Sequence, residues 1–479
     1  MNHKNMQSYN LVIFGAKGDL SCRKLIPALY QLEKKKLLHY DTRIIGVGRA
    51  NWKKNDYIKQ TIQSLNMFST EKIQEKYWNT FKDRLYFCNL DVSNTNNFEN
   101  LKNLLSQKLN KNIYYFAMPP HTFGNICKGL GSVQLNDLNN RIIVEKPIGT
   151  SLQSSQNIHN QLSTYFQEKQ IFRIDHYLGK ETILNLLNFR FSNPLFYNNW
   201  NCHTIEYIEI IIAEKVGIEG RWEYFDKVGQ TKDMIQNHLL QILSLIAMSP
   251  PKKINVQSIK NEKIKVLQAL RAIDANNIHE NTIIGQYSSG MIDGKLVPGY
   301  IEENPLKQKS NTETFSEIKA YIDNDVWKNV PFYLRTGKRL FKKYSEIIIH
   351  FKCIPNNIFN CSISHQYHNK LKIRLQPHEG IEISFLNKIP DLNSKYILQE
   401  QKLDFSYRKS FKNIDIVDAY ERLLLESMKN DPSLFVSKEE IEASWKWIDS
   451  IINAWKKNNI QPILYPAGTL GPKLSRNNN

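Results

Sequence analysis

The sequence has 479 residues, too many for one ordinary hydrophobic core, so its length predicts two or three units, of which we expect two. Its hydrophobic content of 41% and aromatic content of 11% are typical of a globular protein. The net charge of +18 comes from lysines spread along the chain, without a basic arm or a zinc-finger pattern, which argues against a nucleic-acid-binding protein.

The sequence also bears on the compartment. The longest mostly apolar run, residues 239–248, is too short to span a bilayer. Residues 1–10 are polar, and the apolar run 11–14 is too short for a secretory signal. The six cysteines are scattered without a Cys-x-x-Cys pair, which suggests neither a zinc site nor a disulfide framework. We therefore expect a cytoplasmic protein with no membrane segment and no metal.

A glycine turn stands near the start of the chain. The apolar run 9–14 precedes it, and a helical pattern over residues 21–38 follows it. Strand, glycine turn and helix, in this order, are typical of a phosphate-binding loop, although the spacing Gly-x-x-Gly is a weaker signal than Gly-x-Gly-x-x-Gly. Pro27 is predicted to kink or delay the helix. The turn consists of Gly15, Ala16, Lys17, Gly18, Asp19 and Leu20.

A second predicted strand, residues 42–48, ends at Arg49. In a dinucleotide-binding fold this position meets the adenosine ribose. An acidic residue there holds the 2′-hydroxyl of NAD, whereas an arginine suits the 2′-phosphate of NADP. NADP is therefore the expected coenzyme, and a solvated arginine at a strand end is the alternative.

Three further strands of the same kind are predicted at residues 85–91, 112–118 and 141–144, with helical stretches between them, and a strand-like apolar run from Ile171 is expected to close at Asp175. Such alternation is typical of a parallel sheet with crossover helices. Ligands bind at the carboxyl edge of an open parallel sheet. The residues expected at that edge are Gly15, Arg49, Asp91, Pro119, Lys146 and Asp175.

The run 171–174 ends abruptly in ionisable groups. If a helix begins at Asp175, His176 and Lys180 lie at positions i and i+4 on one helical face, beside a positive helix N-terminus. Such a face is a ready anion site. A solvated basic turn is the alternative for an isolated His/Lys pair.

Beyond Asp175 the pattern changes to long β-rich runs, which predict a large, mostly antiparallel sheet. A helix is expected at residues 233–248, and a capping box from Ser437 to Glu440 predicts another helix whose tryptophans lie in the core. Residues 304–311 are predicted to form a mobile loop. The predicted strands span residues 204–213, 314–322, 345–351, 371–375 and 380–386.

Several short motifs are spread over nearly the whole chain. Together, in their order and number, they resemble the glucose-6-phosphate dehydrogenase family of bacterial type. The motifs are Gly15-Ala-Lys-Gly-Asp-Leu20 with Arg23-Lys-Leu25, Tyr115-Phe-Ala-Met-Pro-Pro120, Glu145-Lys-Pro147, Arg173-Ile-Asp-His-Tyr-Leu-Gly-Lys180, Gln236-Asn-His-Leu-Leu240, Tyr333-Leu-Arg-Thr-Gly-Lys338, Tyr420-Glu-Arg-Leu-Leu424 and Tyr465-Pro-Ala-Gly468.

The sequence departs from the family pattern at a few positions. Trp222-Glu223 replaces at least one glycine, and Lys232 stands where the family usually has arginine. Ile183-Leu184 also differ from the usual family sequence. The changes at Trp222-Glu223 and at Lys232 lie near the expected substrate site, so they bear on the details of substrate binding and not on the reaction.

The resemblance implies oxidation of D-glucose 6-phosphate at C1 with hydride transfer to NADP, the first oxidative step of the pentose phosphate pathway. It implies that His238 is the general base and that Asp175 orients it and stabilises the imidazolium. The large open antiparallel sheet favours a homo-oligomer, because its outer face needs cover, and we expect a dimer with a tetramer as the alternative.

The remaining roles also follow from the resemblance. The residues expected to bind the substrate are His176, Tyr177, Lys180, Glu214, Asp233, Lys338 and Lys343. The residues expected to bind the coenzyme are Gly15, Ala16, Lys17, Gly18, Asp19, Leu20, Arg49, Asp91, Val92 and Lys146. A cis bond before Pro147 is one way to set the geometry beside Lys146.

We expect a Rossmann-like coenzyme domain over residues 1–180 and a β+α domain for substrate binding and dimerisation over residues 181–479. Two other functions stay open. One is a related sugar oxidoreductase acting on an unphosphorylated sugar, against which the His176/Lys180 pair argues. The other is a coenzyme-binding regulator without turnover, against which His238 and Asp175 argue.

Overall fold

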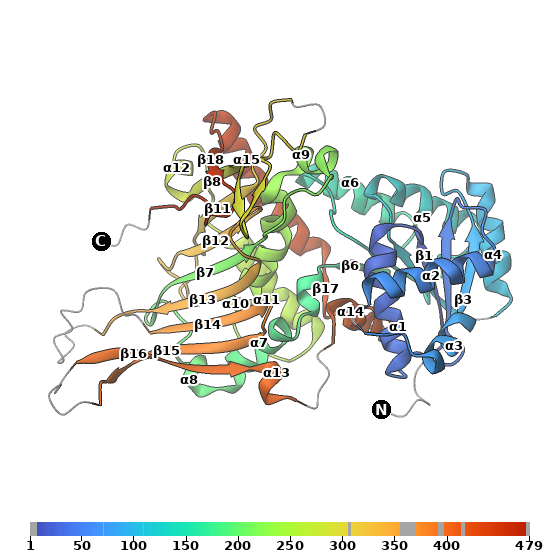
Figure 1. Ribbon diagram of the computed structural model, residues 1–479, viewed down its shortest axis with the longest axis horizontal. Helices are drawn as coiled ribbons and strands as arrows, with labels where there is room; N and C mark the ends of the chain where they lie inside the picture. Colours follow the sequence, from blue (N-terminus) through green and yellow to red (C-terminus); the bar gives the residue numbers. More distant parts are fainter. Residues whose placement is uncertain are drawn as a thin grey trace. The chain divides into compact units, whose positions relative to one another are not determined.

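The computed structural model describes residues 7–69, 71–108, 110–304, 308–354, 369–390, 397–412 and 417–475. The chain divides into two compact units (Figure 1). The first comprises Met1–Lys180 with Val417–Glu442, and the second comprises Glu181–Ile416 with Ala443–Asn479. The sequence expectation, residues 1–180 and 181–479, did not include the return of the later segment to the first unit.

The first unit is built on a seven-stranded sheet in the order β17-β6-β5-β4-β1-β2-β3. Six strands are parallel, and β17 is antiparallel to β6. The central strands are buried on both faces, as their continuous apolar sequences require. The Rossmann-like fold is therefore confirmed. The strands are β1 (Tyr9–Phe14), β2 (Arg43–Gly48), β3 (Leu85–Asn89), β4 (Lys111–Phe116), β5 (Arg141–Val144), β6 (Ile171–Ile174) and β17 (Phe435–Val436).

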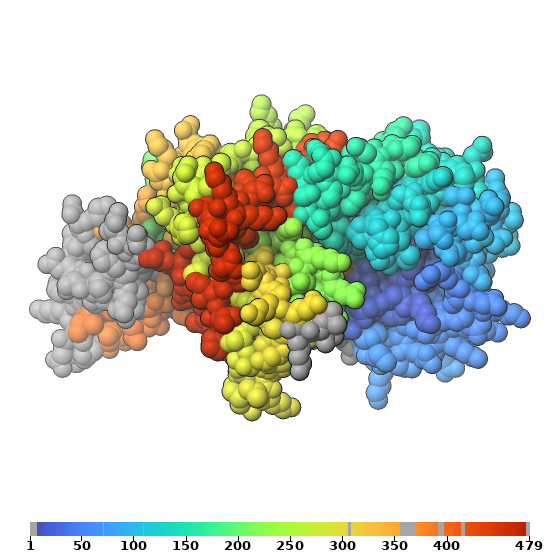
Figure 2. All heavy atoms as spheres, turned by 90° about the horizontal axis from the view of Figure 1, so that it is seen from above, coloured from blue at the N-terminus to red at the C-terminus, as the bar shows by residue number. Residues whose placement is uncertain are grey.

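Helices cover both faces of this sheet, and the N-terminal part forms one continuous body, blue to teal in Figure 2. On one face lie α1 (Ile26–Lys34), α2 (Lys54–Phe68), α3 (Glu75–Asp83) and α14 (Ala419–Lys429). On the other lie α4 (Phe98–Ser106), α5 (Phe123–Ser132) and α6 (Leu152–Ser163). Short 3₁₀ turns are η3 (Thr95–Asn97), η4 (Pro120–Thr122), η5 (Glu168–Gln170) and η6 (His176–Gly179).

Pro27 has the predicted effect on its helix. A π-helical turn, η2 (Ser21–Leu25), precedes α1, and Pro27 lies in the first turn of α1. Leu25 and Ile26 have helical backbone angles, so η2 leads directly into α1 and the winding changes, without a break, just before the proline.

The stretch after β6 differs from the expectation. Residues His176–Gly179 form the short turn η6, Lys180 has an extended backbone, and α7 begins only at Glu181. His176 and Lys180 therefore do not share an α-helical face. The carboxylate of Asp175 accepts a hydrogen bond of 2.9 Å from the Tyr177 N–H, and this cap favours a tight turn over an α-helix.

The second unit contains a nine-stranded sheet in the order β16-β15-β14-β13-β7-β12-β11-β8-β18. It is antiparallel except at the pairs β12·β7 and β18·β8, so the predicted sheet type is confirmed. The strands are β7 (Ile205–Ala213), β8 (Thr282–Ser288), β11 (Phe315–Ala320), β12 (Phe332–Gly337), β13 (Tyr344–Phe351), β14 (Lys370–Gln376), β15 (Gly380–Lys388), β16 (Leu398–Ser406) and β18 (Ile463–Pro466), with a separate hairpin of β9 (Gly290–Ile292) and β10 (Lys295–Val297).

The predicted helix over residues 233–248 is present, but its first part, η7 (Thr231–Leu239), is wound as a π-helix before α10 (Leu240–Ala247). The Ser437/Glu440 capping box is confirmed at the start of α15 (Lys438–Lys457), and Trp445 is buried. Part of the predicted loop 304–311 lies outside the described residues. The other helices are α7 (Glu181–Ser192), α8 (Pro194–Tyr197), α9 (Trp222–Gln230), α11 (Val256–Gln268), α12 (Ile278–Asn281) and α13 (Tyr407–Ser410).

Candidate active site

The glycine loop after β1 requires Gly15. This residue has φ +86°, and its N–H donates a hydrogen bond of 3.0 Å to the carbonyl of Val47. A Cβ atom on Gly15 would lie 2.4 Å from the carbonyl oxygen of Ala117, closer than real Cβ atoms come to an oxygen. Only glycine therefore lets the loop lie this close to the ends of β2 and β4.

A cavity of about 850 Å³ opens at the carboxyl ends of β1 to β4. Asp19, Leu20 and Lys146 are not among its lining residues, and Asp19 instead pairs with Arg23 at 2.9 Å. The predicted coenzyme residues that line this cavity are Gly15, Ala16, Lys17, Gly18, Arg49, Asp91 and Val92.

Charged groups surround the cavity where β2 and β3 end. Asp91 accepts hydrogen bonds from the N–H and the hydroxyl of Ser93, at 3.0 and 2.8 Å. These bonds, with a smaller contribution from the Arg49 charge, lower the pKa of Asp91. The ammonium of Lys17 lies 5.6 Å from the ring centroid of Trp52. Two cations and one fixed carboxylate therefore border the cavity on this side.

Other lining residues were not predicted as ligands. Met118 and Pro119 follow β4, and the strand end at Pro119 was the signal available for them. Ser93, His121 and Asn125 also line the cavity. Ser93 lies in a turn, and His121 and Asn125 lie near the starts of helices. No sequence motif at these places tells a residue that lines a cavity from one that is exposed to solvent.

The peptide bond between Lys146 and Pro147, directly after β5, is cis. This agrees with the geometry considered from the sequence. Lys146 thus begins the loop that leaves the sheet between β5 and α6.

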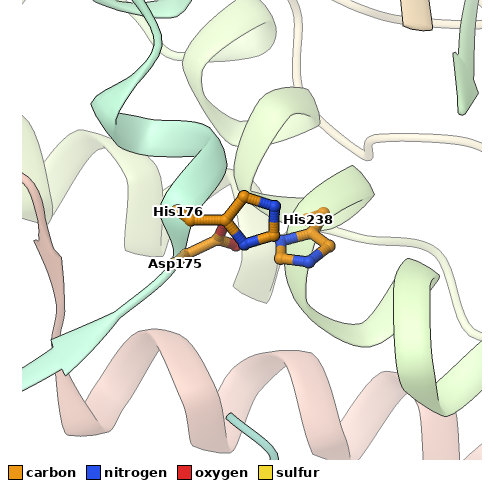
Figure 3. A group of neighbouring side chains, drawn as sticks. All are labelled: Asp175, His176 and His238. Atoms are coloured by element: carbon orange, nitrogen blue, oxygen red, sulfur yellow. The ribbon is translucent and has the colours of Figure 1, made fainter. Parts of the chain in front are cut away.

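Asp175 and His176 leave the end of β6 (Figure 3). Asp175 is 2% exposed. The imidazole of His176 stacks on the ring of Tyr420 from α14, with centroids 6.1 Å apart and an interplanar angle of 13°. The ammonium of Lys180 lies 5.2 Å from the ring centroid of Tyr177. The first unit therefore gathers a carboxylate, an imidazole and an ammonium beyond the edge of its sheet.

In the second unit, Lys338 and Glu214 lie together. The Lys338 ammonium donates to the Glu214 carboxylate at 2.7 Å and is almost fully buried. The side-chain amide of Gln230 donates to Glu214 at 3.4 Å and to the Thr336 hydroxyl at 2.7 Å. Glu214 follows β7 and Lys338 follows β12. Because these two strands are neighbours in the sheet and both contact η7, the pair lies next to η7.

The helix η7 carries both Asp233 and His238. Asp233 accepts a long hydrogen bond of 3.5 Å from the Tyr224 hydroxyl. His238 is 1% exposed, and Figure 3 shows its imidazole projecting from this helix. Lys343 lies between β12 and β13 and is exposed. The second unit thus supplies the remaining predicted substrate residues.

Two of the three departures from the family pattern, Trp222-Glu223 and Lys232, have local structural partners. The indole of Trp222 packs against the ring of Tyr300 with centroids 4.4 Å apart and an interplanar angle of 31°, so the larger residue fills space against an aromatic neighbour. Burial lowers the pKa of Lys232, and the Glu313 carboxylate opposes this shift. Both changes are accommodated next to α9 and η7.

Within the described residues, no helix is long and apolar enough to cross a membrane.

Comparison with known proteins places these features in a family. The family model "Glucose-6-phosphate dehydrogenase, NAD binding domain" matches residues 12–185, and "Glucose-6-phosphate dehydrogenase, C-terminal domain" matches residues 187–478. The chain is 54% identical over 469 residues to a glucose-6-phosphate 1-dehydrogenase of Dickeya dadantii (strain 3937), covering 98% of the chain and 96% of that protein. It is 56% identical over 479 residues to that of Buchnera aphidicola subsp. Baizongia pistaciae (strain Bp), covering 99% and 98%.

A solved structure is also similar. It is described as "Glucose-6-phosphate dehydrogenase in complex with its substrate glucose-6-phosphate", with a TM-score of 0.89 and 33% identity, and the match covers 98% of this chain and 96% of that one. Both halves of the sequence and the whole fold therefore agree. The chain belongs to the glucose-6-phosphate dehydrogenase family, a family of oxidoreductases that act on a CH–OH donor.

Proposed function

We propose that the protein oxidises D-glucose 6-phosphate at C1 to 6-phospho-D-glucono-1,5-lactone with NADP as hydride acceptor. This is the first oxidative step of the pentose phosphate pathway and supplies NADPH. The observation that carries the proposal is the match over nearly the full chain to a structure described as binding glucose 6-phosphate. The acid, imidazole and ammonium groups beyond β6 support it.

His238 acts as the general base in this proposal. A neutral imidazole has suitable basicity near pH 7 to take the proton of the C1 hydroxyl. Asp175 orients that imidazole and stabilises the imidazolium that forms, as the carboxylate of a catalytic triad does. NADP, when bound, supplies the nicotinamide that accepts the hydride.

The substrate phosphate is dianionic and is best held by charge-assisted donors. His176, Lys180 and Lys343 supply charge, and Tyr177 supplies a hydroxyl. The sugar hydroxyls need both donors and acceptors, which Glu214, Asp233 and Lys338 provide. The ion pair between Lys338 and Glu214 keeps both groups ordered before the sugar arrives.

The first-unit cavity fits the coenzyme. Gly15, Ala16, Lys17 and Gly18 line the cavity, and a glycine-rich backbone at this edge of a parallel sheet suits a pyrophosphate. In this proposal Arg49 binds the 2′-phosphate, Asp91 and Val92 bind the adenosine end, and Lys146 lies near the nicotinamide. The presence of Arg49 after β2 favours NADP over NAD.

Three properties of the whole molecule belong to the same proposal. The first unit serves as the coenzyme domain, and the second serves substrate binding and dimerisation. Along β14 in the nine-stranded sheet, buried side chains alternate with partly exposed ones, so one face of the sheet is less covered than the other. We propose that a second copy of the chain covers this face. A dimer is proposed, with a tetramer as the alternative form. The proposed location is the cytoplasm.

An absorbance assay for reduced nicotinamide tests the function. Purified protein is given NADP with glucose 6-phosphate, NADP with glucose, and NAD with glucose 6-phosphate. The first pair should give the highest kcat/KM. Equal rates with both sugars would support an unphosphorylated substrate instead, and coenzyme binding without any turnover would support a regulator.

A further inference from the structure

Glu313 lies at the start of η7, the helix that carries Asp233, and the proposed mechanism does not use it. The backbone breaks between α9 and η7 at Gly229, which has φ +74°. At a helix start the first N–H groups have no partner within the helix. The main-chain carbonyl of Glu313 accepts from the Gln230 N–H at 3.0 Å, and its side-chain Oε1 accepts from the Thr231 N–H at 3.0 Å. One residue therefore holds the first two N–H groups after the break.

The carboxyl group of Glu313 lies against the break itself. A Cβ atom on Gly229 would be 2.5 Å from Oε2 of Glu313 and 2.6 Å from Oε1, distances that a real Cβ atom does not reach. Glycine is required here both for its backbone angle and for the space that the carboxyl group occupies. The break between the two helices and the side chain that caps η7 are therefore fitted to each other.

The segment that carries Glu313 is held at both of its neighbours. The Thr314 N–H donates to a carbonyl of β8 at 2.8 Å, and the side-chain amide of Gln286 donates to the carbonyl of Thr312 at 3.0 Å. The Thr312 hydroxyl donates to the carbonyl of Asp226 in α9 at 2.7 Å. Glu313 therefore offers its oxygen to η7 from a backbone that is bound to β8 and to α9.

The start of η7 lies among the groups proposed to bind the sugar. Asp233 follows Thr231 by two residues in the same helix. The main-chain N–H of Lys338, the partner of Glu214, donates to the carbonyl of Thr314 at 2.9 Å. A shift of the first turn of η7 would therefore move Asp233 relative to the ion pair of Lys338 and Glu214.

We propose that Glu313 is a positioning residue for Asp233: by accepting the hydrogen bond of the Thr231 N–H it orders the first turn of η7 and so fixes the carboxylate that binds the sugar. The proposal rests on the sugar-binding role proposed for Asp233. Glu313 acts through the backbone of η7 and not by contact with the substrate. Without this cap the first turn is ordered in only a fraction of the molecules, and the apparent affinity for the sugar falls with that fraction.

The substitution Glu313→Ala tests this in the full-length enzyme. It deletes the side-chain acceptor and leaves the main-chain bond to Gln230 in place. We expect KM for glucose 6-phosphate to rise by about fivefold, the factor that corresponds to one typical helix-capping bond, with kcat changed by less than about twofold. KM for unphosphorylated glucose should rise by the same factor, because the ring hydroxyls are the same. KM for NADP should stay the same.

The substitution Glu313→Gln separates the acceptor from the charge. Glutamine keeps a carbonyl oxygen that can accept from the Thr231 N–H, so KM for glucose 6-phosphate should stay within about twofold of the parent. A rise as large as that of the alanine variant would mean that the group acts through its charge, and this result overturns the proposal. Should Glu313→Ala not fold, Glu313→Asp, whose shorter side chain withdraws the acceptor, replaces it with the same expected results.

The control variant is Asn255→Ala, which removes a helix cap elsewhere in the second unit. The side chain of Asn255 accepts from the Ser258 N–H at 2.9 Å at the start of α11. Its loss should lower the melting temperature and leave KM for glucose 6-phosphate unchanged. If this variant and Glu313→Ala raise that KM equally, the effect reflects general destabilisation and the proposal fails.

A double-mutant comparison identifies the route. In an Asp233→Ala background Glu313→Ala should have no further effect on KM for glucose 6-phosphate, because the carboxylate that it positions is gone. The same rise in both backgrounds, or no rise in the parent, overturns the positioning role. If Asp233→Ala by itself leaves that KM unchanged, the sugar-binding role proposed for Asp233 fails instead.

Discussion

Arg49, Lys180 and His238 occupy surroundings that differ in ways that kinetics can separate. Arg49 lines the cavity at the end of β2, Lys180 lies beside the ring of Tyr177, and His238 is buried on η7. A group that binds one ligand should change the KM of that ligand. A group that takes a proton in the transition state should change kcat.

His238→Asn should lower kcat by roughly 10²–10⁴-fold or more, because the amide cannot act as a base at neutral pH. The affinity for glucose 6-phosphate, measured by equilibrium titration, should stay nearly the same. Asp175→Asn should give a smaller loss of the same kind. A loss of activity that arises only from a raised KM would remove His238 from the role of base.

Arg49→Ala should raise KM for NADP much more than KM for NAD, since only NADP loses a charge-assisted contact to its 2′-phosphate. Initial rates at varied coenzyme and saturating sugar phosphate give both values. Equal changes for the two coenzymes would mean that Arg49 does not touch the 2′-phosphate.

Lys180→Ala should cost roughly 1.5–3 kcal/mol in kcat/KM for glucose 6-phosphate, the range for a hydrogen bond to a charged group. Glucose, which lacks the phosphate, should be affected far less. Inorganic phosphate should compete with the substrate in the parent and hardly at all in the variant. The exposed Lys169 provides a matched control, and Lys169→Ala should change neither value. A similar loss with both sugars would place the anion site elsewhere.

At the scale of elements, the hydrophobic pattern predicted most of the structure. Residues 9–14 and 141–144 form β1 and β5 with the predicted bounds, and the run from Ile171 forms β6, which ends one residue before Asp175. Short apolar runs bounded by turns are typical of buried strands in a parallel sheet. The strand β16 was not predicted. The residues Leu398–Ser406 are mostly polar and exposed, so the sequence lacks the alternation of apolar and polar residues that predicts a strand. The two-residue strand β17 is too short for any pattern.

Part of the candidate site was also predictable from the sequence, because several of its residues directly follow predicted strands. Gly15, Arg49 and Asp91 follow strand ends, where sequence position alone predicts the ligand edge of the sheet. The contact between the rings of His176 and Tyr420 was not predictable, because it depends on where α14 packs. Nor could the pattern show that the helix carrying His238 is π-wound, since the apolar spacing is compatible with both windings.

The late segment with β17 and α14 should matter for the stability of the first unit. The ring of Phe435 is buried against Phe172 with centroids 4.7 Å apart. Phe435→Ala should therefore lower the free energy of unfolding by about 3–5 kcal/mol, the usual range for such a truncation. Denaturant unfolding followed by circular dichroism measures the change. Ser433→Ala, nearby and partly exposed, should stay within about 0.5 kcal/mol of the parent.

At the scale of the whole molecule, several buried carboxyl groups have raised pKa values, Glu145 and Glu313 among them, and burial is the first cause in each. An acid whose pKa is higher in the folded than in the unfolded state binds a proton more tightly when folded. Its contribution to stability is present below the unfolded pKa and is lost as pH rises through the folded pKa. These groups therefore favour the folded state at mildly acidic pH.

Glu145→Gln should remove one such contribution. Its pKa of about 6, against an ordinary value of 4.5, corresponds to about 2 kcal/mol. As pH rises from about 4 to 7, the parent should lose about 2 kcal/mol of unfolding free energy relative to the variant. Denaturant titrations of both proteins at several pH values measure this difference. A constant difference would mean that Glu145 has the same pKa in both states.

The return of residues 417–442 to the first unit has a consequence for synthesis on the ribosome. The strand β6 ends at Ile174, and its antiparallel neighbour β17 begins at Phe435. At roughly 5–20 residues per second, the intervening chain takes roughly 13–52 s to emerge. For that time the parallel strand β6 lacks its antiparallel neighbour, and the helical layer to which α14 belongs is incomplete. An unpaired strand is a template for pairing with other chains, so a chaperone that shields the edge at β6 should reduce misassembly of the nascent first unit.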